Sequence, residues 1–136
     1  MVGDIHQPLH CISRYNVQYP KGDKGGGLVP IRSNIAGNLH AYWDRGAGLF
    51  YPINPYRIKK IAHLAREIES QQNKHMRGVK NLNPQTWAKN SYQIAKNTAY
   101  DIQGSTSPTE KYTQTAQTAI TRQIALAGYR LARILN

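Results

Sequence analysis

Three helix start signals constrain the fold of this chain more than any other sequence feature. They are NPYR from Asn54, NPQTW from Asn83 and SPTE from Ser107. Each sets an N-cap side chain before a proline at the first helical position, and the last adds the glutamate of a capping box. Apolar residues recur at helical spacing after each signal, and no stretch shows the period-two alternation of a half-buried strand. The sequence therefore predicts an all-α fold.

The apolar residues that follow the signals predict three helices with one apolar face each. The first stripe consists of Ile58, Ile61, Ala62, Ala65 and Ile68. The second helix is expected to run through Trp87, Ile94 and Ala95 towards Gly104. The last stripe consists of Ile120, Ile124, Ala127, Leu131 and Leu135. These spacings place each set on one side of its helix.

The first third of the chain has a different character. Residues 1–10 are predicted to be the tail of a helix that Pro8 helps to end, because proline interrupts the helical hydrogen-bond ladder. Residues 11–37 are rich in Gly, Pro and polar residues and predict a long loop, which in a compact domain usually has a function. The pattern becomes helical again from Asn38, through NLHAYWD. No linker suggests a second domain, so residues 1–136 are expected to form a single domain.

The charge balance favours anionic partners without selecting one. The chain has 18 Lys and Arg against 7 Asp and Glu, a formal net charge of +11. Such an excess suits nucleic acid, phosphate esters or acidic lipid surfaces, and it also suits a generally basic surface. No apolar run approaches the about 18 residues of a membrane-spanning helix. The first ten residues contain neither the basic region nor the apolar region that an export signal has. The sequence therefore does not predict a localisation.

Histidines and aspartates with metal-ligand spacing gather in the first 44 residues. His40 and Asp44 are four residues apart and share one face of the predicted helix, so they can hold one cation together. Imidazole nitrogen with carboxylate oxygen is typical zinc chemistry. His10 is the best candidate for a third ligand, which would leave a coordination position for water or substrate. The alternative is that the HxxxD pair only caps, hydrogen-bonds or faces solvent.

Three motifs in the same order as in a known family make this interpretation more specific. GDIHQPLH, GDKGG and NLHAYWD together resemble the signature of the S1/P1 nucleases, zinc-dependent enzymes of the phospholipase C/P1 nuclease superfamily. The later segments WAKNSYQIA and AGYRLARILN resemble the late helices of the family. The resemblance implies an all-α fold and three Zn²⁺ ions. It also implies hydrolysis of single-stranded DNA and RNA and of 3′-nucleotide phosphates, with members usually secreted or periplasmic.

The resemblance also implies roles for individual residues. His10, His40 and Asp44 would bind one zinc, and Asp4 would be the metal-bridging, catalytic carboxylate that serves the other two ions. His6 would have no direct ligand role and would form a supporting hydrogen bond. Apart from the resemblance, the sequence itself predicts substrate contacts for Lys24, a cation near the metal motifs, and for Gly25 and Gly26, because a glycine turn lets the backbone approach a phosphate.

The chain departs from the family pattern before Met1. The family motif HxxxDxHQPLH begins with a histidine that would fall one position before Met1, and the N-terminal half of the family supplies further ligands. The chain is therefore expected to represent the C-terminal portion, with one zinc, partial others and impaired turnover. It is also expected to expose apolar surface that favours self-association or an N-terminal complement. Two alternatives are a non-catalytic, zinc-stabilised basic helical module that binds nucleic acid or phosphate, and a phospholipase C-like hydrolase.

Overall fold

The computed structural model describes residues 1–52, 58–102 and 106–136. The described part contains helices and no strand, with one isolated bridge between Pro30 and Asn38. The α-helices are α1 (Val2–Ile5), α2 (Leu39–Asp44), α3 (Ile58–Gln71), α4 (Pro84–Ile94) and α5 (Glu110–Leu135). Short 3-10 helices η1 (Pro8–Cys11) and η2 (Gly46–Gly48) and a π-helical turn η3 (Ala95–Ala99) complete it. The predicted all-α fold is confirmed.

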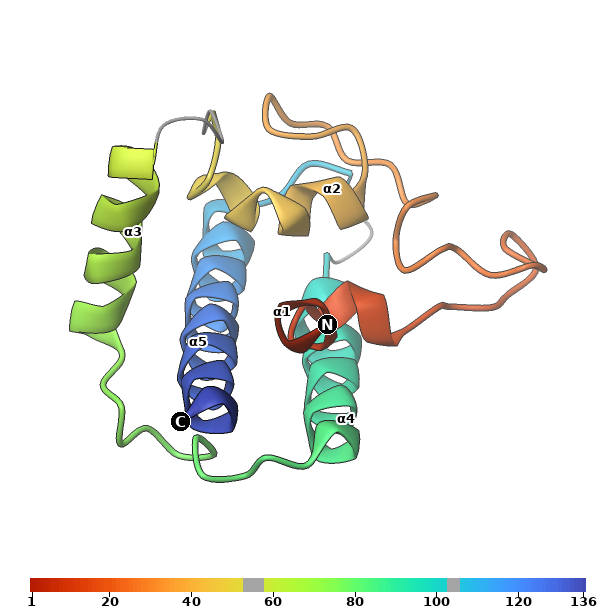
Figure 1. Cartoon of the computed structure of the whole chain (residues 1–136). Helices are drawn as coiled ribbons and strands as arrows, with labels where there is room; N and C mark the ends of the chain where they lie inside the picture. Colours follow the sequence, from red (N-terminus) through yellow and green to blue (C-terminus); the bar gives the residue numbers. More distant parts are fainter. Residues whose placement is uncertain (53–57, 103–105) are drawn as a thin grey trace.

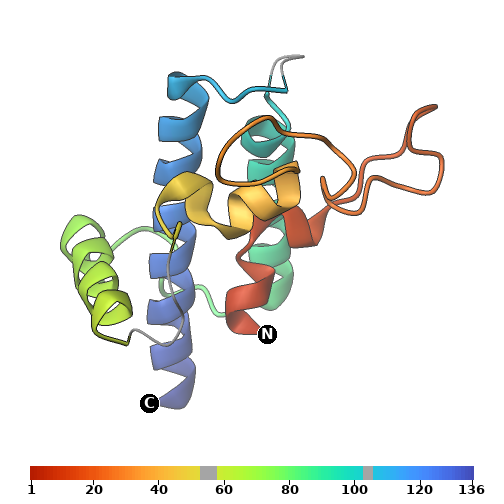
Figure 2. The same ribbon diagram turned by 90° about the horizontal axis from the view of Figure 1, so that it is seen from above.

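Helix α5 is the longest element, and the other helices are arranged around it. Helices α3 and α4 lie along its two sides, and α2 crosses over it (Figure 1). The view from above shows the same order and places the N-terminal segment beside α4 (Figure 2). Described residues contain no helix that is both long and apolar enough to cross a membrane. The long loop between η1 and α2 extends to one side of this helical body.

The predicted helix starts agree with the structure to different degrees. Asn83 is the N-cap of α4, with its side chain accepting the N–H of Gln85, as predicted. The N-cap of α5 is Thr109 rather than Ser107, because the Thr109 hydroxyl accepts the N–H of Tyr112 at 3.1 Å. The predicted capping box at Ser107 is therefore wrong by two residues. The Asn54-Pro55 start of α3 and the approach of α4 to Gly104 lie outside the described residues.

Pro8 begins an element instead of ending one, which corrects the prediction for residues 1–10. Helix α1 ends at Ile5, and the chain turns at Gln7 before the 3-10 helix η1. The Gln7 side chain accepts the N–H of Leu9, and Pro8 occupies the first helical position, where a missing N–H costs nothing. His6 and His10 therefore do not belong to one continuous helix.

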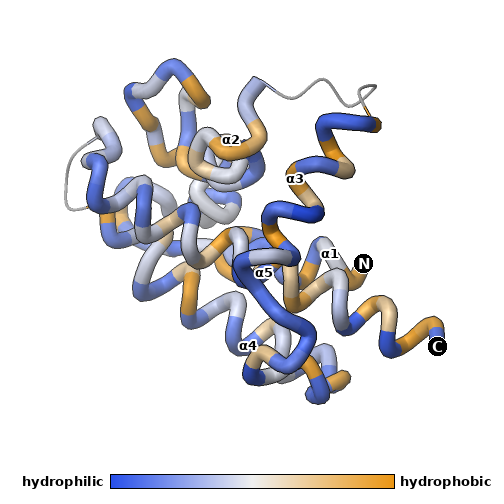
Figure 3. The backbone as a smooth tube through the Cα atoms, turned by 90° about the vertical axis from the view of Figure 1, so that its left-hand side faces the viewer, coloured by the Kyte–Doolittle hydropathy of each residue, from blue (hydrophilic) through white to orange (hydrophobic). Residues whose placement is uncertain are grey.

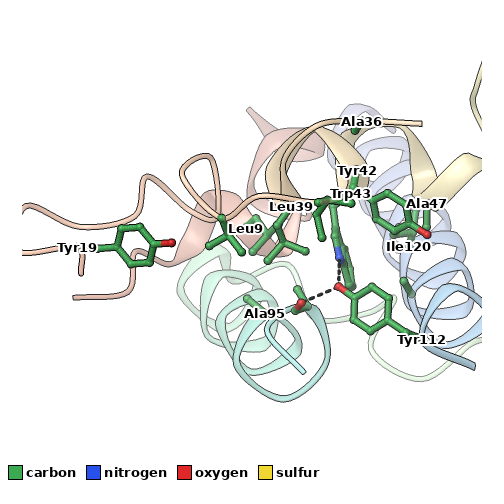
Figure 4. Packing of buried hydrophobic residues seen from close by; sticks show 14 residues of the cluster. Leu9, Tyr19, Ala36, Leu39, Tyr42, Trp43, Ala47, Ala95, Tyr112 and Ile120 are labelled. Carbon is green, nitrogen blue, oxygen red and sulfur yellow. Dashed lines mark hydrogen bonds between the residues drawn. The ribbon is translucent and has the colours of Figure 1, made fainter. Parts of the chain in front are cut away.

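The core joins α2 to α4 and α5 through buried aromatic side chains. The Trp43 indole donates to the Tyr112 hydroxyl at 3.0 Å, and that hydroxyl donates to the Ala99 carbonyl (Figure 4). Trp43 is 2% exposed. The Tyr42 hydroxyl forms a hydrogen bond with Thr113 of α5. These contacts fix α2, which carries His40 and Asp44, against the helical body.

Two predicted apolar stripes are only partly buried. In α3 only Ile68 is buried, whereas Ile58 and Ile61 are exposed. In α5 Ile120 is buried, but Ile124 and Leu135 are 40% and 74% exposed. The buried face of α5 is instead formed by Tyr112, Ala116, Ile120, Thr121, Gln123, Ala125, Leu126 and Arg130. Hydrophobic segments, in orange, alternate with hydrophilic ones, in blue, along α3 in Figure 3.

Candidate metal centre

The α2 helix presents His40 and Asp44 on one face, as their spacing predicts. Asn38 starts the helix by accepting the N–H of Ala41 at 2.8 Å. Nε2 of His40 lies 3.5 Å from Oδ2 of Asp44, one helical turn later. Both side chains are partly exposed, so a ligand in solvent can reach them.

His10 approaches the same carboxylate from η1. Its Nε2 lies 3.8 Å from Oδ1 of Asp44. Its ring stacks on that of His40, with the two centroids 5.0 Å apart and an angle of 16° between the planes. One ligand atom from each of His10, His40 and Asp44 lies within 4.8 Å of the others. The structure thus brings together three side chains that are separated by up to 34 positions in the sequence.

The hydrogen bonds of the two histidines determine which ring nitrogen remains available. Nδ1 of His40 lies 3.0 Å from the Gly25 carbonyl oxygen, which can only accept a hydrogen bond. Nδ1 of His10 lies 2.8 Å from Oδ1 of Asp4, an acceptor when the carboxylate is ionised. Both rings therefore carry hydrogen on Nδ1, and in a neutral imidazole of this tautomer the lone pair lies on Nε2, which faces Asp44. Two lone pairs facing a carboxylate repel one another, and a shared cation converts the repulsion into attraction.

Asp4 lies beside the three-residue group rather than in it. Its side chain is 68% exposed and its Oδ1 bonds to His10. A carboxylate in this position orients a ligating imidazole and raises its basicity. The predicted role of Asp4 as a bridge to further ions stays a prediction.

Gln7 is a functional candidate that the sequence reasoning missed. Its side-chain amide donates from Nε2 to Oδ1 of Asp44 at 2.9 Å. Its Oε1 accepts the N–H of Leu9, so both ends of the amide are held. The signal was the glutamine directly before Pro8, where a polar side chain caps the turn that carries His10.

The glycine turn supports His40 through its backbone. Gly25 and Gly26 are buried, and their carbonyl oxygens accept from the ring and the backbone N–H of His40, respectively. Gly25 has φ +60°, and a Cβ there would lie 2.2 Å from the Leu9 carbonyl oxygen. Lys24 is exposed. The predicted substrate contacts of Lys24, Gly25 and Gly26 stay predictions, and the structure gives the two glycines a role in orienting His40.

A buried aspartate organises this turn. Asp23 is fully buried, and its Oδ1 accepts the N–H groups of Arg14 and Gly26 and the hydroxyl of Tyr100. Tyr100 follows η3, so Asp23 ties the loop to the end of the α4 segment. Burial, with the hydrogen bond to Asp23, holds the pKa of Tyr100 well above its usual value and keeps the hydroxyl a donor.

His6 lies in the interior and is not one of the three grouped ligands. Its Nε2 contacts the Arg130 guanidinium at 2.5 Å, and its Nδ1 bonds to the Val2 carbonyl. Burial lowers the pKa of His6, against the opposing effect of the Val2 hydrogen bond and with help from the charge of Arg130. The ring is therefore held neutral and accepts from Arg130.

Helices α4 and α5 hold the backbone on which these side chains lie. The Ser91 hydroxyl donates to the Ile5 carbonyl at 2.7 Å. The Gln123 amide donates to the His6 carbonyl and to the Ser91 hydroxyl, both at 3.0 Å. The segment between Asp4 and His10 is thus anchored on a buried polar network.

The donor set fits a tetrahedral metal with nitrogen and oxygen ligands. Bonds of about 2.0–2.2 Å to such an ion place neighbouring ligand atoms about 3.4 Å apart. The distances of 3.5 and 3.8 Å between the Nε2 atoms and the Asp44 oxygens are close to that spacing. The free ring nitrogens and the open side of the group match a site with three protein ligands and one exchangeable position.

Comparison with known proteins identifies the family of the chain. The family model described as S1/P1 Nuclease matches residues 1–136, the whole chain. No curated protein and no solved structure matches the chain. Since the family model covers every residue, including the motifs that carry His10, His40 and Asp44, the chain belongs to the S1/P1 nuclease family.

Proposed function

We propose that this chain is a zinc-dependent nuclease that hydrolyses single-stranded DNA and RNA and removes 3′-phosphates from nucleotides. Membership of the family supports a nuclease-type function with nucleic-acid substrates. The observation that carries the proposal is the convergence of the Nε2 atoms of His10 and His40 on the Asp44 carboxylate.

Zinc suits this donor set better than the harder divalent cations. Mg²⁺ and Ca²⁺ prefer sites made of oxygen ligands, whereas imidazole favours zinc and its transition-metal neighbours. His10, His40 and Asp44 supply two nitrogens and one carboxylate. When bound, the ion would supply Lewis acidity towards a phosphoryl oxygen.

The protein residues contribute orientation and access. Asp4 and the Gly25 carbonyl hold the two imidazoles in one tautomer, and Gln7 holds the Asp44 carboxylate. Pre-set ligands of this kind need little rearrangement when the ion and a phosphate enter. The exposed Lys24 side chain is proposed to attract the incoming phosphate from the loop.

We expect one zinc at this group and slow turnover by the chain alone. The described residues form one group of three ligands, and Asp4, which lies beside it, is the further carboxylate of the GDIHQPLH motif. Asp4 is proposed to serve additional ions if further ligands are supplied, with its Oδ1 shared with His10. One ion cannot stabilise the attacking and leaving oxygens separately, as a metal cluster can.

The direct test is zinc binding and cleavage by matched variants. Calorimetry should give one tight zinc per chain, lost in His40→Ala and Asp44→Ala and retained in His63→Ala, a histidine on the exposed side of α3. Slow cleavage of single-stranded DNA should follow the same pattern and stop with chelator. Equal zinc binding by His40→Ala and the unmodified protein would refute the proposed site.

The net charge of +11 supports a second candidate, a non-catalytic zinc-stabilised module that binds nucleic acid. Zinc-dependent stability and single-strand binding without any cleavage would select it. The phospholipase alternative would require cleavage of phospholipid in place of oligonucleotide in parallel assays.

A further inference from the structure

A strongly basic cleft lies away from the three-residue group, between the segment that joins α3 to α4 and the last turns of α5. In Figure 1 this segment runs beneath the C-terminal end of α5. The cleft has a volume of about 1080 Å³. Its cationic lining consists of Lys74, Arg77, Lys80 and Arg133, with His75 beside them. No aspartate or glutamate is among its lining residues.

These charges have no acidic partner within the described parts of the chain. The ion pairs found there join His10, His40 or Arg14 to aspartates. Lys74, Arg77, Lys80 and Arg133 are all exposed. Like charges held around one concave surface raise the local potential and attract a polyanion.

The cleft is built on hydrogen bonds from α5. The Arg130 guanidinium donates from Nε and Nη2 to the Gly78 carbonyl at 3.3 and 3.0 Å. Arg122 donates to the Arg77 carbonyl, and the Tyr129 hydroxyl donates to the Gln72 carbonyl. These bonds hold the backbone of the segment and so fix the positions from which its basic side chains extend.

One buried residue connects the cleft with the segment that carries the metal ligands. Arg130 is 2% exposed and touches the Gly78 carbonyl with one part of its guanidinium and the His6 ring with Nη1. His6 lies between Asp4 and His10 in the sequence. The basic segment and the ligand-bearing segment therefore both hydrogen-bond to the guanidinium of one buried side chain.

We propose that this cleft binds the phosphate backbone of a single-stranded nucleic acid, at nucleotides other than the one at the three-residue group. Tyr129 and Met76 are half-buried lining residues that add aromatic and apolar surface to the cations, and this combination suits splayed bases together with phosphates. A concave surface fits a strand better than a flat anionic membrane. The choice of a nucleic acid rests on the proposed function, whereas the location of the site does not.

The test compares two triple variants that remove the same charge. The first is Lys74→Gln, Arg77→Gln and Lys80→Gln in the cleft. The control is Lys59→Gln, Lys60→Gln and Arg66→Gln, three exposed cations on α3. Binding of fluorescent oligothymidylate is measured by anisotropy in chelator over a range of salt concentrations, so that neither zinc nor cleavage affects the result. Far-UV circular dichroism and thermal unfolding establish that both variants are folded.

The cleft variant should bind roughly tenfold more weakly than the unmodified protein at moderate salt. Its slope of log affinity against log salt should fall by about 2, since each single-strand phosphate contact contributes about 0.7. The α3 variant should change binding less than about twofold. Equal losses in both variants would show attraction by net charge alone and overturn the proposal. Unchanged oligonucleotide binding, with or without lost binding to phosphatidylserine vesicles, would also overturn it.

Failure of the proposed function gives a different result. If the chain neither binds zinc nor cleaves DNA, the anisotropy difference between the two triple variants is still expected. If zinc binding is present and the difference is absent, the three-residue group remains supported and the cleft does not.

Discussion

Each of the two stacked imidazoles has its Nδ1 committed to a protein acceptor and its Nε2 turned towards the same carboxylate. The acceptor is a backbone carbonyl for His40 and the Asp4 carboxylate for His10. The difference matters for experiments. A backbone carbonyl cannot be removed by a substitution, whereas the Asp4 carboxylate can. Asp4 is therefore the residue at which orientation of a ligand can be tested.

Asp4→Ala should weaken zinc binding roughly 10- to 100-fold while leaving one zinc per chain, because loss of a carboxylate partner frees the ring of a ligating histidine. Competition with a chromogenic chelator measures the affinity. Asp101→Ala, which removes an exposed carboxylate elsewhere, is the control. A drop in stoichiometry with unchanged affinity at the remaining site would instead identify Asp4 as a ligand of a separate ion.

The buried His6 predicts a pH effect on the stability of the metal-free protein. Its folded-state pKa lies below the ordinary value of 6.5, chiefly because of burial. Between these two values the unfolded chain binds a proton that the folded chain does not, so stability is full above about pH 6.5 and falls below it. Urea unfolding should show a lower free energy of unfolding at about pH 5.5 than at about pH 7.5.

His6→Gln should reduce that difference, and His63→Gln on α3 should leave it unchanged. For each variant, the quantity to compare is the difference between its free energies of unfolding at the two pH values. His6→Gln is expected to lower the free energy of unfolding at both pH values, so the absolute values are not compared. A full pH difference in His6→Gln would contradict the assignment to this ring.

At the scale of elements, helix termini decide where the ligands lie. Asn38 begins α2 one residue before Leu39, which places His40 in its first turn and Asp44 one turn later. Gln7 and Pro8 begin η1 and place His10 in its last turn. The same kind of signal was misassigned at α5, where Ser107 and Thr109 both precede the helix and the Thr109 hydroxyl accepts the N–H of Tyr112.

Thr109→Ala should lower the free energy of unfolding by about 1 kcal/mol, because the N–H of Tyr112 loses its cap. Urea denaturation provides the measurement. Thr118→Ala, an exposed threonine within the same helix, should change stability by less than about 0.5 kcal/mol. Equal effects at the two positions would place the helix start elsewhere.

At the scale of the whole molecule, the three-residue group connects segments that share no secondary structure. His10 comes from η1, while His40 and Asp44 come from α2, and the loop between them is organised by buried Asp23. An ion that binds all three closes this loop in the folded state and has no equal site in the unfolded chain. Metal binding is therefore expected to stabilise the entire fold.

Zinc at about 100 times its Kd should raise the free energy of unfolding by about 2.7 kcal/mol. Thermal unfolding with and without zinc measures the gain as an increase in Tm. The gain should vanish in the double variant His40→Ala and Asp44→Ala, whose metal-free stability serves as its own reference. An equal zinc effect in that variant would locate the bound metal elsewhere.

Local sequence determined the helical class, the start of α4 and the shared face of His40 and Asp44, because capping and the helical repeat act within a few residues. It also supplied His10 as a candidate, but not the means by which His10 reaches α2. Tertiary structure decided that Gly25 orients His40 and that Gln7 holds Asp44. It also decided that the charged Arg130 occupies the interior while Ile124 stays on the surface. These outcomes depend on contacts between residues far apart in the chain. Such contacts form only when the folded chain packs, so a local sequence pattern does not encode them.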